Sequence, residues 1–189
     1  IGGLGGGEYG YKKIKHQKFL SDNKENINKP IKIWANKGSG KGSRFTWNYI
    51  DKDKLDTIPS VLLQTRKVML DKKGHSIMTG RGNIINNLPE IVEKNAIASG
   101  DVLFIIPAKD TDRDLKLIRS LFMTKTIRFL MSLTQKDLYV RGFENIPDYT
   151  LLAKDMKDDK FTDQFFYKHF NFSDELINHI EKSISPKDE

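Results

Sequence analysis

The strongest constraint on the fold is the stretch of residues 101–133, which reads DVLFIIPAKDTDRDLKLIRSLFMTKTIRFLMSL. Its first apolar run, residues 102–106, predicts a short buried strand. Thr111 and Asp114 then have the spacing of a capping box, which begins a helix. Apolar residues beyond this cap recur at helical intervals and predict one amphipathic helix of about six turns. They are Leu115, Ile118, Phe122, Phe129, Leu130 and Leu133.

A β-rich segment is predicted ahead of this stretch. Residues 31–50 alternate in side-chain character on either side of a glycine-rich loop, which is typical of a β-hairpin. Residues 61–70 predict a central strand, and residues 90–100 predict a short helix. The expected class is therefore α+β, with a twisted mixed β-sheet, a long amphipathic helix and a C-terminal helical tail.

Three segments are expected along the 189 residues. Residues 1–30 begin with glycines and predict a linker or N-terminal extension. Residues 31–133 predict the main domain, and residues 134–189 predict a helical segment that packs on it. The chain has no cysteine, which excludes disulfides, thiolate metal sites and cysteine nucleophiles. No window resembles a membrane helix or a signal peptide, so we expect a cytoplasmic protein without a membrane partner.

Positive charge is concentrated in the N-terminal half. Residues 1–100 contain 18 Lys and Arg against 9 Asp and Glu, whereas residues 101–189 contain 14 against 16. A positive field of this kind attracts polyanions, of which nucleic acid is the commonest in a cytoplasmic protein. A solvated lysine-rich surface is the alternative interpretation of the same composition.

The predicted hairpin loop, residues 37–44, reads KGSGKGSR. It supplies Lys37, Lys41 and Arg44 as candidates for contacts with a phosphate backbone, which glycines allow to approach closely. The alternative is a nucleotide-binding enzyme that uses GSGKGS as a phosphate loop. Against this alternative, the residues after Ser43 alternate as in a strand, and a phosphate loop would be followed by a helix.

Three further side chains are candidates for contacts with bases. Arg81 and Asn83 lie in a glycine- and asparagine-rich loop, and Arg66 lies in the predicted central strand. Arginine pairs with guanine and asparagine with adenine in the major groove, so a loop rich in both suits direct readout. The simpler interpretation is that Asn and Gly are common loop residues.

No constellation of residues predicts hydrolysis or group transfer, so whether the chain is an enzyme is left uncertain. The four histidines are scattered, which is the usual pattern of surface residues. They are His16, His75, His169 and His179. A protein-interaction module remains a second alternative. No metal ligand set and no cofactor site is predicted in this chain.

The C-terminal half resembles a known family. TKTIRFL at residues 124–130 is similar to the T-K-x-x-R-F-L helix motif near the end of bacterial restriction–modification N6-adenine DNA methyltransferases of the fused or type II kind. FENIP at residues 143–147 resembles their aromatic-x-x-[VI]-P segment. Residues 161–186 resemble their closing helices, which read T-D-x-x-L-Y-x-x-Y-x-L-[ST] and then I-E-x-x-I-x-P.

The resemblance implies a function for the chain. The family's catalytic [DN]-P-P-[YFW] motif is not present, because the six prolines are never adjacent. The resemblance therefore implies that residues 31–133 are a DNA target-recognition domain, with double-stranded DNA and the catalytic methyltransferase domain of the parent protein as partners. S-adenosylmethionine is expected to bind that catalytic domain and not this chain. Lys125 and Arg128 of the long helix are further cations that are open to DNA contacts, with an internal salt bridge as the alternative for Arg128.

Overall fold

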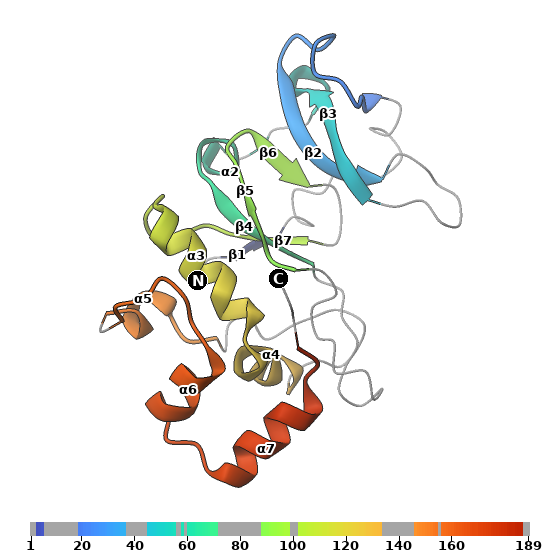
Figure 1. The fold of residues 1–189 in the computed structure, drawn as a ribbon. Helices are drawn as coiled ribbons and strands as arrows, with labels where there is room; N and C mark the ends of the chain where they lie inside the picture. The colour runs from blue at the N-terminus through green and yellow to red at the C-terminus, as the bar shows by residue number, and fades with distance from the viewer. Residues whose placement is uncertain are drawn as a thin grey trace.

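The computed structural model describes residues 3–5, 19–36, 45–55, 58, 60–71, 88–98, 102–133, 146–154 and 156–186. Within these residues, helices and two small sheets form an α+β fold, as the sequence predicts. Figure 1 shows the β2–β3 hairpin at one end of the molecule, a sheet in the middle and the C-terminal helices at the other end. The hairpin and the C-terminal helices thus lie at opposite ends of the molecule (Figure 1).

The central sheet has four strands in the order β1-β7-β4-β5, and all its neighbours are antiparallel. The strands are β1 (Gly3–Gly5), β4 (Lys67–Asp71), β5 (Glu90–Val92) and β7 (Val102–Ile105). Strand β7 is the short apolar strand that the sequence predicts. Strand β1 belongs to the segment predicted as a linker, so part of that segment is structured and pairs with β7.

The second sheet has three strands in the order β3-β2-β6. Strands β2 (Pro30–Asn36) and β3 (Phe45–Asp51) form an antiparallel hairpin, which confirms the prediction for residues 31–50. Strand β6 (Ala96–Ala98) pairs with β2 in parallel, which makes this sheet mixed. A short 3-10 turn, η2 (Lys52–Lys54), follows the hairpin.

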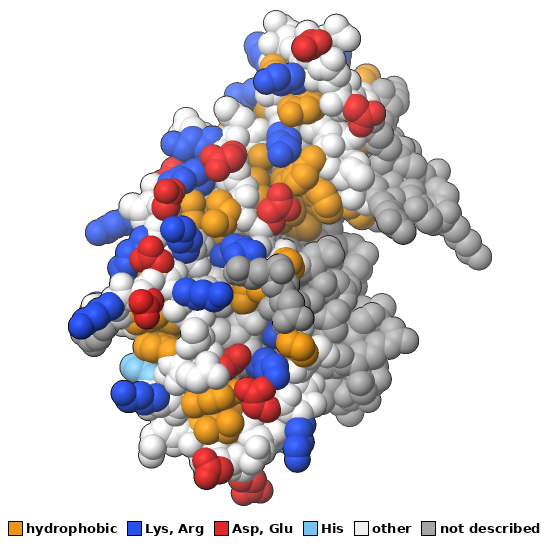
Figure 2. All heavy atoms as spheres, in the orientation of Figure 1, with side chains coloured by type: hydrophobic (Ala, Val, Ile, Leu, Met, Phe, Trp, Pro, Cys, Tyr) orange, Lys and Arg blue, Asp and Glu red, His pale blue; other side chains and the backbone are white. Residues whose placement is uncertain are grey.

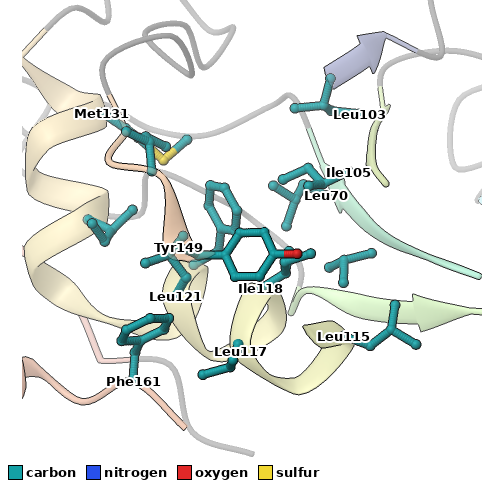
Figure 3. Packing of buried hydrophobic residues seen from close by; sticks show 14 of the residues in the cluster. Leu70, Leu103, Ile105, Leu115, Leu117, Ile118, Leu121, Met131, Tyr149 and Phe161 are labelled. Carbon is teal, nitrogen blue, oxygen red and sulfur yellow. The ribbon is translucent and has the colours of Figure 1, made fainter. Parts of the chain in front are cut away.

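Helices cover the two sheets. Those described are α2 (Ser60–Gln64), α3 (Asp112–Met123), α4 (Lys125–Ser132), α5 (Tyr149–Leu152), α6 (Asp163–His169) and α7 (Asp174–Ser183). One face of the central sheet packs on α3, and the C-terminal helices complete this core (Figure 3). Its members from the sheet are Val68, Leu70, Leu103 and Ile105, and those from the helices include Leu115, Ile118, Leu121, Met131 and Phe166.

The prediction of one six-turn helix is wrong in one respect, because the helix is interrupted at Thr124 and forms two helices, α3 and α4. Thr124 has an extended backbone (φ −69°, ψ 144°), and its hydroxyl accepts from the amide of Ile127 as the N-cap of α4. The break shifts the buried face. Ile127 and Met131 are buried in α4, whereas the predicted core residue Leu133 is 66% exposed.

The predicted strand at residues 61–70 is wrong in its first half, which is helix α2. Leu62 and Leu63 are buried there, and the chain becomes strand β4 only at Lys67. A short apolar run fits a buried strand and a buried helical turn equally well, so periodicity does not separate them. The ammonium of Lys67 then binds the carbonyls of Leu62 (2.6 Å) and Thr65 (3.3 Å), which stabilises the end of α2.

The predicted helix at residues 90–100 is also wrong, because this segment forms strands β5 and β6 on either side of a turn. Asn95 adopts the left-handed conformation in this turn (φ 56°), which asparagine tolerates better than most residues. Its amide donates to the carbonyl of Leu63 (2.8 Å), and its carbonyl accepts from the amide of Lys32 (3.0 Å). Pairing with β4 and β2 decides the conformation here, and local propensity does not.

Lys67 predicts a pH dependence of stability. Its side chain is fully buried and lies 5.3 Å from the ring centroid of Phe104. Burial lowers the pKa of its ammonium from 10.5 to about 8. Between these pH values the unfolded chain binds a proton that the folded chain has released, so this group makes the protein more stable as the pH rises.

We therefore expect the stability of wild type relative to Lys67→Met to increase between about pH 7 and pH 10, by on the order of 1–3 kcal/mol. Urea unfolding at several pH values measures this difference. The exposed Lys116 on α3 is the control, because Lys116→Met should leave the pH dependence of wild type unchanged. A difference between wild type and Lys67→Met that stays constant with pH would contradict the prediction.

Candidate nucleic-acid interface

The β2–β3 hairpin has two faces of different character. In its register Ile31 lies opposite Ile50, and Ile33 lies opposite Asn48. These four side chains are buried, and the three isoleucines form a core with Leu63 of α2. Because successive residues of a strand point to opposite faces, the alternate positions form the second face. The first face of the hairpin is thus anchored in this core, and on the second face the two tryptophans pack in part against another apolar core, which includes residues of β4, β6 and β7.

The second face is aromatic and carries a lysine. Trp34 lies opposite Trp47, and Lys32 lies opposite Tyr49. Phe45 completes the row on β3, and all four rings are half-buried, whereas Lys32 is exposed. We call these five residues the aromatic face. Figure 2 shows hydrophobic side chains gathered on the surface where the hairpin meets β6, with charged side chains among them.

The rings of the aromatic face contact one another. The centroids of Trp34 and Trp47 are 5.3 Å apart in an edge-to-face arrangement, and those of Trp34 and Phe45 are 6.5 Å apart with an interplanar angle of 24°. The ammonium of Lys32 lies 4.7 Å from the ring centroid of Trp47. The indole nitrogen of Trp47 donates to Oε1 of Glu90 at 3.1 Å. These contacts hold the Trp47 ring in one orientation.

Five of the six predicted DNA contacts lie outside the described residues. Lys37, Lys41 and Arg44 belong to the segment that links β2 to β3, and Arg81 and Asn83 belong to the segment between β4 and β5. Their roles stay predictions. Strands β2 and β3 are paired as far as Asn36 and Phe45, so the segment that contains Lys37, Lys41 and Arg44 connects these two paired ends.

Arg66, the sixth candidate, is described and is held by two carboxylates. Its Nε lies 2.7 Å from Asp110, and its Nη1 lies 2.5 Å from Asp112. Hydrogen bonds from Arg66 lower the pKa of both carboxyl groups. The hydrogen bonds that Arg66 donates to Asp112, and secondly to Asp110, in turn raise the pKa of the guanidinium. Lys94 also lies 3.3 Å from Asp110. A base contact by Arg66 would have to compete with these ion pairs.

The residues of the T-K-x-x-R-F-L segment form a structural network. Asp163 accepts from the backbone amides of Lys125 (3.1 Å) and Thr126 (2.8 Å) and from the Thr126 hydroxyl (2.8 Å), so it caps α4 from the start of α6. Lys125 forms an ion pair with Glu181 of α7, and Tyr167 donates to the same carboxylate at 2.8 Å. Helices α4, α6 and α7 are joined by these bonds.

Arg128 is the centre of this network and is fully buried. Its guanidinium donates to the carbonyls of Ser185 (2.6 Å), Met123 (3.1 Å) and Thr124 (3.2 Å). Burial lowers the pKa of this group to about 10. Arg128 therefore binds the end of α3 and the C-terminal segment to α4. It is excluded as a DNA contact in this conformation, and Lys125 is paired with Glu181.

A groove of about 640 Å³ lies beside the aromatic face, between β5 and α3. Its lining residues are Leu88, Pro89, Glu90, Ile91, Lys116, Arg119, Ser120, Asp159 and Lys160. Arg119 donates to the carbonyl of Pro89 at 3.0 Å, and Asp159 pairs with Arg113 at 3.3 Å. Glu90 belongs to the groove and also binds Trp47, so the two surfaces are neighbours.

Within the described ranges, no group of three or more His, Asp and Glu residues is placed to hold a metal ion. The same residues contain no helix that is both long enough and apolar enough to span a membrane.

No protein-family model matches the chain, and no curated protein or solved structure is significantly similar to it. The site must therefore be interpreted from its own chemistry. The alternation of residues 45–50 in the sequence places Phe45, Trp47 and Tyr49 on one face of a strand, but it does not show that Trp34 and Lys32 of the adjacent strand join them. The register of the hairpin is needed to bring these residues together. It cannot be read from the sequence, because the loop length alone does not determine which residue of β2 lies opposite which residue of β3.

Proposed function

We propose that the chain binds double-stranded DNA, as the target-recognition part of a restriction–modification adenine-N6 methyltransferase. The observation that carries this proposal is the hairpin β2–β3, a two-stranded ribbon at one end of the molecule (Figure 1). A two-stranded ribbon fits the major groove of B-form DNA. Residues 29–54, which contain this hairpin, have seven Lys and Arg against two Asp and Glu.

The proposed mechanism separates positioning from readout. Lys37, Lys41 and Arg44 neutralise backbone phosphates and so fix the hairpin on the duplex, without sequence information. Arg81 and Asn83 are the proposed readers of base edges, because arginine and asparagine form paired hydrogen bonds with guanine and adenine. A separate catalytic domain with bound S-adenosylmethionine would flip and methylate the adenine.

The network around Arg128 supports the C-terminal part of the proposal. Residues that carry the resemblance to the methyltransferase family contact one another across α4, α6 and α7, since Lys125 binds both Asp163 and Glu181. Arg128 likewise binds the carbonyl of Thr124. A motif whose members bind one another suits a structural support for a recognition surface. It does not suit a catalytic centre, since the network places no reactive group in a cavity.

The nucleotide-binding alternative finds less support in the fold. A phosphate loop opens a helix, whose N-terminus binds the phosphates. Here residues 37–44 are followed by strand β3, which pairs with β2 over its full length. The protein-interaction alternative predicts no DNA binding at low salt, so the experiment below also addresses it.

A triple substitution tests the proposed interface. We expect Lys37→Gln, Lys41→Gln and Arg44→Gln together to weaken binding to a labelled DNA duplex. They should also reduce the slope of log K against log salt by about 2–3, because each lost phosphate contact removes about 0.9 from it. Fluorescence anisotropy between about 50 and 200 mM salt measures both quantities.

The control is a triple substitution in the acidic half, Lys154→Gln, Lys157→Gln and Lys168→Gln. These lysines are exposed, and their loss changes the net charge by the same amount. If the two triple variants lose the same affinity and slope, the hairpin is not the interface. If wild type does not bind duplex DNA at low salt, the proposed function is wrong.

A further inference from the structure

We propose that the aromatic face of the β2–β3 hairpin stacks on unpaired nucleobases of DNA. The inference rests on the proposed function in taking DNA as the partner. It adds which part of the DNA this face binds, namely a base that lies outside the double helix.

Three rings on two strands form a continuous surface. Trp34 contacts both Trp47 and Phe45, with centroid distances of 5.3 and 6.5 Å, and each ring is only half-buried. An unpaired base has two apolar faces and stacks on such rings whichever of the four bases it is. In an intact duplex the neighbouring base pairs stack on these faces and cover them, so the surface distinguishes unpaired from paired DNA.

The geometry of Trp47 favours stacking over general apolar contact. Its indole nitrogen is bound to Glu90 (3.1 Å), and the ammonium of Lys32 lies over one face of its ring (4.7 Å from the centroid). A ring that is already held in place loses little conformational entropy when a ligand binds. Lys32 is exposed and lies next to the ring, where it can pair with the phosphate beside a stacked base.

Charge identifies the occupant of this surface. The hairpin segment, residues 29–54, has a net charge of +5 from its Lys, Arg, Asp and Glu residues. An apolar protein partner would cover Lys32 without neutralising it, which is costly. A strand of DNA offers aromatic bases at the rings and phosphates at the lysine. Single-stranded DNA therefore fits both features of the surface, whereas an apolar partner fits only one.

The chain contains an internal reporter for this site, because its only two tryptophans, Trp34 and Trp47, both lie on the aromatic face. The probes are an oligothymidylate, an intact DNA duplex and the same duplex with one bulged thymine. Stacking quenches indole fluorescence. We expect strong quenching by the oligothymidylate and the bulged duplex, and weaker quenching by the intact duplex.

Variants connect the signal to the rings. We expect Trp47→Leu to weaken binding of a labelled oligothymidylate about 10-fold or more, as measured by anisotropy, and Trp47→Phe to retain affinity within about threefold. Phe45→Leu is a second variant on the same face, should Trp47→Leu not fold as judged by circular dichroism. Phe170, an exposed ring in the C-terminal part, is the control, and Phe170→Leu should bind as wild type does.

The outcomes separate this inference from the proposed function. Binding of the intact duplex without quenching by either unpaired probe overturns the stacking surface and leaves the proposed function in place. Quenching by oligothymidylate without duplex binding supports the stacking surface and overturns duplex recognition. Equal oligothymidylate affinities of Trp47→Leu, Phe45→Leu and Phe170→Leu also overturn the inference.

Discussion

Replacing Arg128 with methionine is expected to lower the free energy of unfolding by about 3–5 kcal/mol. The arginine is fully buried, and its guanidinium donates to three carbonyls, those of Met123, Thr124 and Ser185. Methionine fills much of the same volume but donates no hydrogen bond. The three carbonyls, of which that of Thr124 is buried and the other two are partly buried, would then lose this donor, each at a cost of up to about 1–3 kcal/mol before relaxation. Urea unfolding followed by circular dichroism measures the change.

Two further variants test the cause of this loss. Arg128→Lys keeps the charge but not the planar group that reaches three carbonyls, so it should be nearly as destabilising as Arg128→Met. Lys116→Met removes an exposed lysine from α3 and should change stability by less than about 0.5 kcal/mol. If Arg128→Lys is as stable as wild type, buried charge and not hydrogen-bond geometry is what the site requires.

Asp163→Ala is expected to destabilise the protein by about 2–3 kcal/mol. One carboxylate oxygen accepts from the amide and hydroxyl of Thr126 (both 2.8 Å), and the other accepts from the amide of Lys125 (3.1 Å). These two amides belong to the first turn of α4, which has no acidic residue of its own. Their loss leaves two orphan donors at the start of α4 and removes a favourable charge there.

Asp174 provides a matched control for Asp163. Each is the first residue of its helix, after the N-caps Thr162 and Ser173. Asp174 is exposed and caps no other helix, so Asp174→Ala should cost only the helix-dipole contribution, about 0.3–1 kcal/mol. Equal losses for the two variants in urea unfolding would show that Asp163 acts only on its own helix.

Local signals in the sequence predicted those elements whose side chains alternate or whose caps are explicit. The alternation in residues 31–50 predicted the hairpin, and Thr111 predicted the start of α3, where its hydroxyl accepts from the amide of Asp114. Thr124 was not recognised as a break. Threonine is tolerated inside helices, and its role here depends on Asp163, which lies far along the chain and completes the cap of α4.

The remaining errors have the same physical origin. Residues 90–100 are strands because β4 and β2 offer partners, and the turn between them is possible because Asn95 accepts a positive φ. Neither partner is visible in the local sequence. The same limit applies to the aromatic face, since Lys32 and Trp34 join the rings of β3 only through the register. Candidate cations were found by composition, but their ion-pair partners were not, as Arg66 with Asp110 and Asp112 shows.

The turn at Asn95 has a mechanical consequence for the hairpin. It joins β5 of the central sheet to β6 of the hairpin sheet, and its amide and carbonyl are bonded to Leu63 and Lys32. These two bonds connect the turn to helix α2 and to strand β2. The orientation of the hairpin relative to the central sheet therefore depends on these two bonds together with the pairing of β2 with β6.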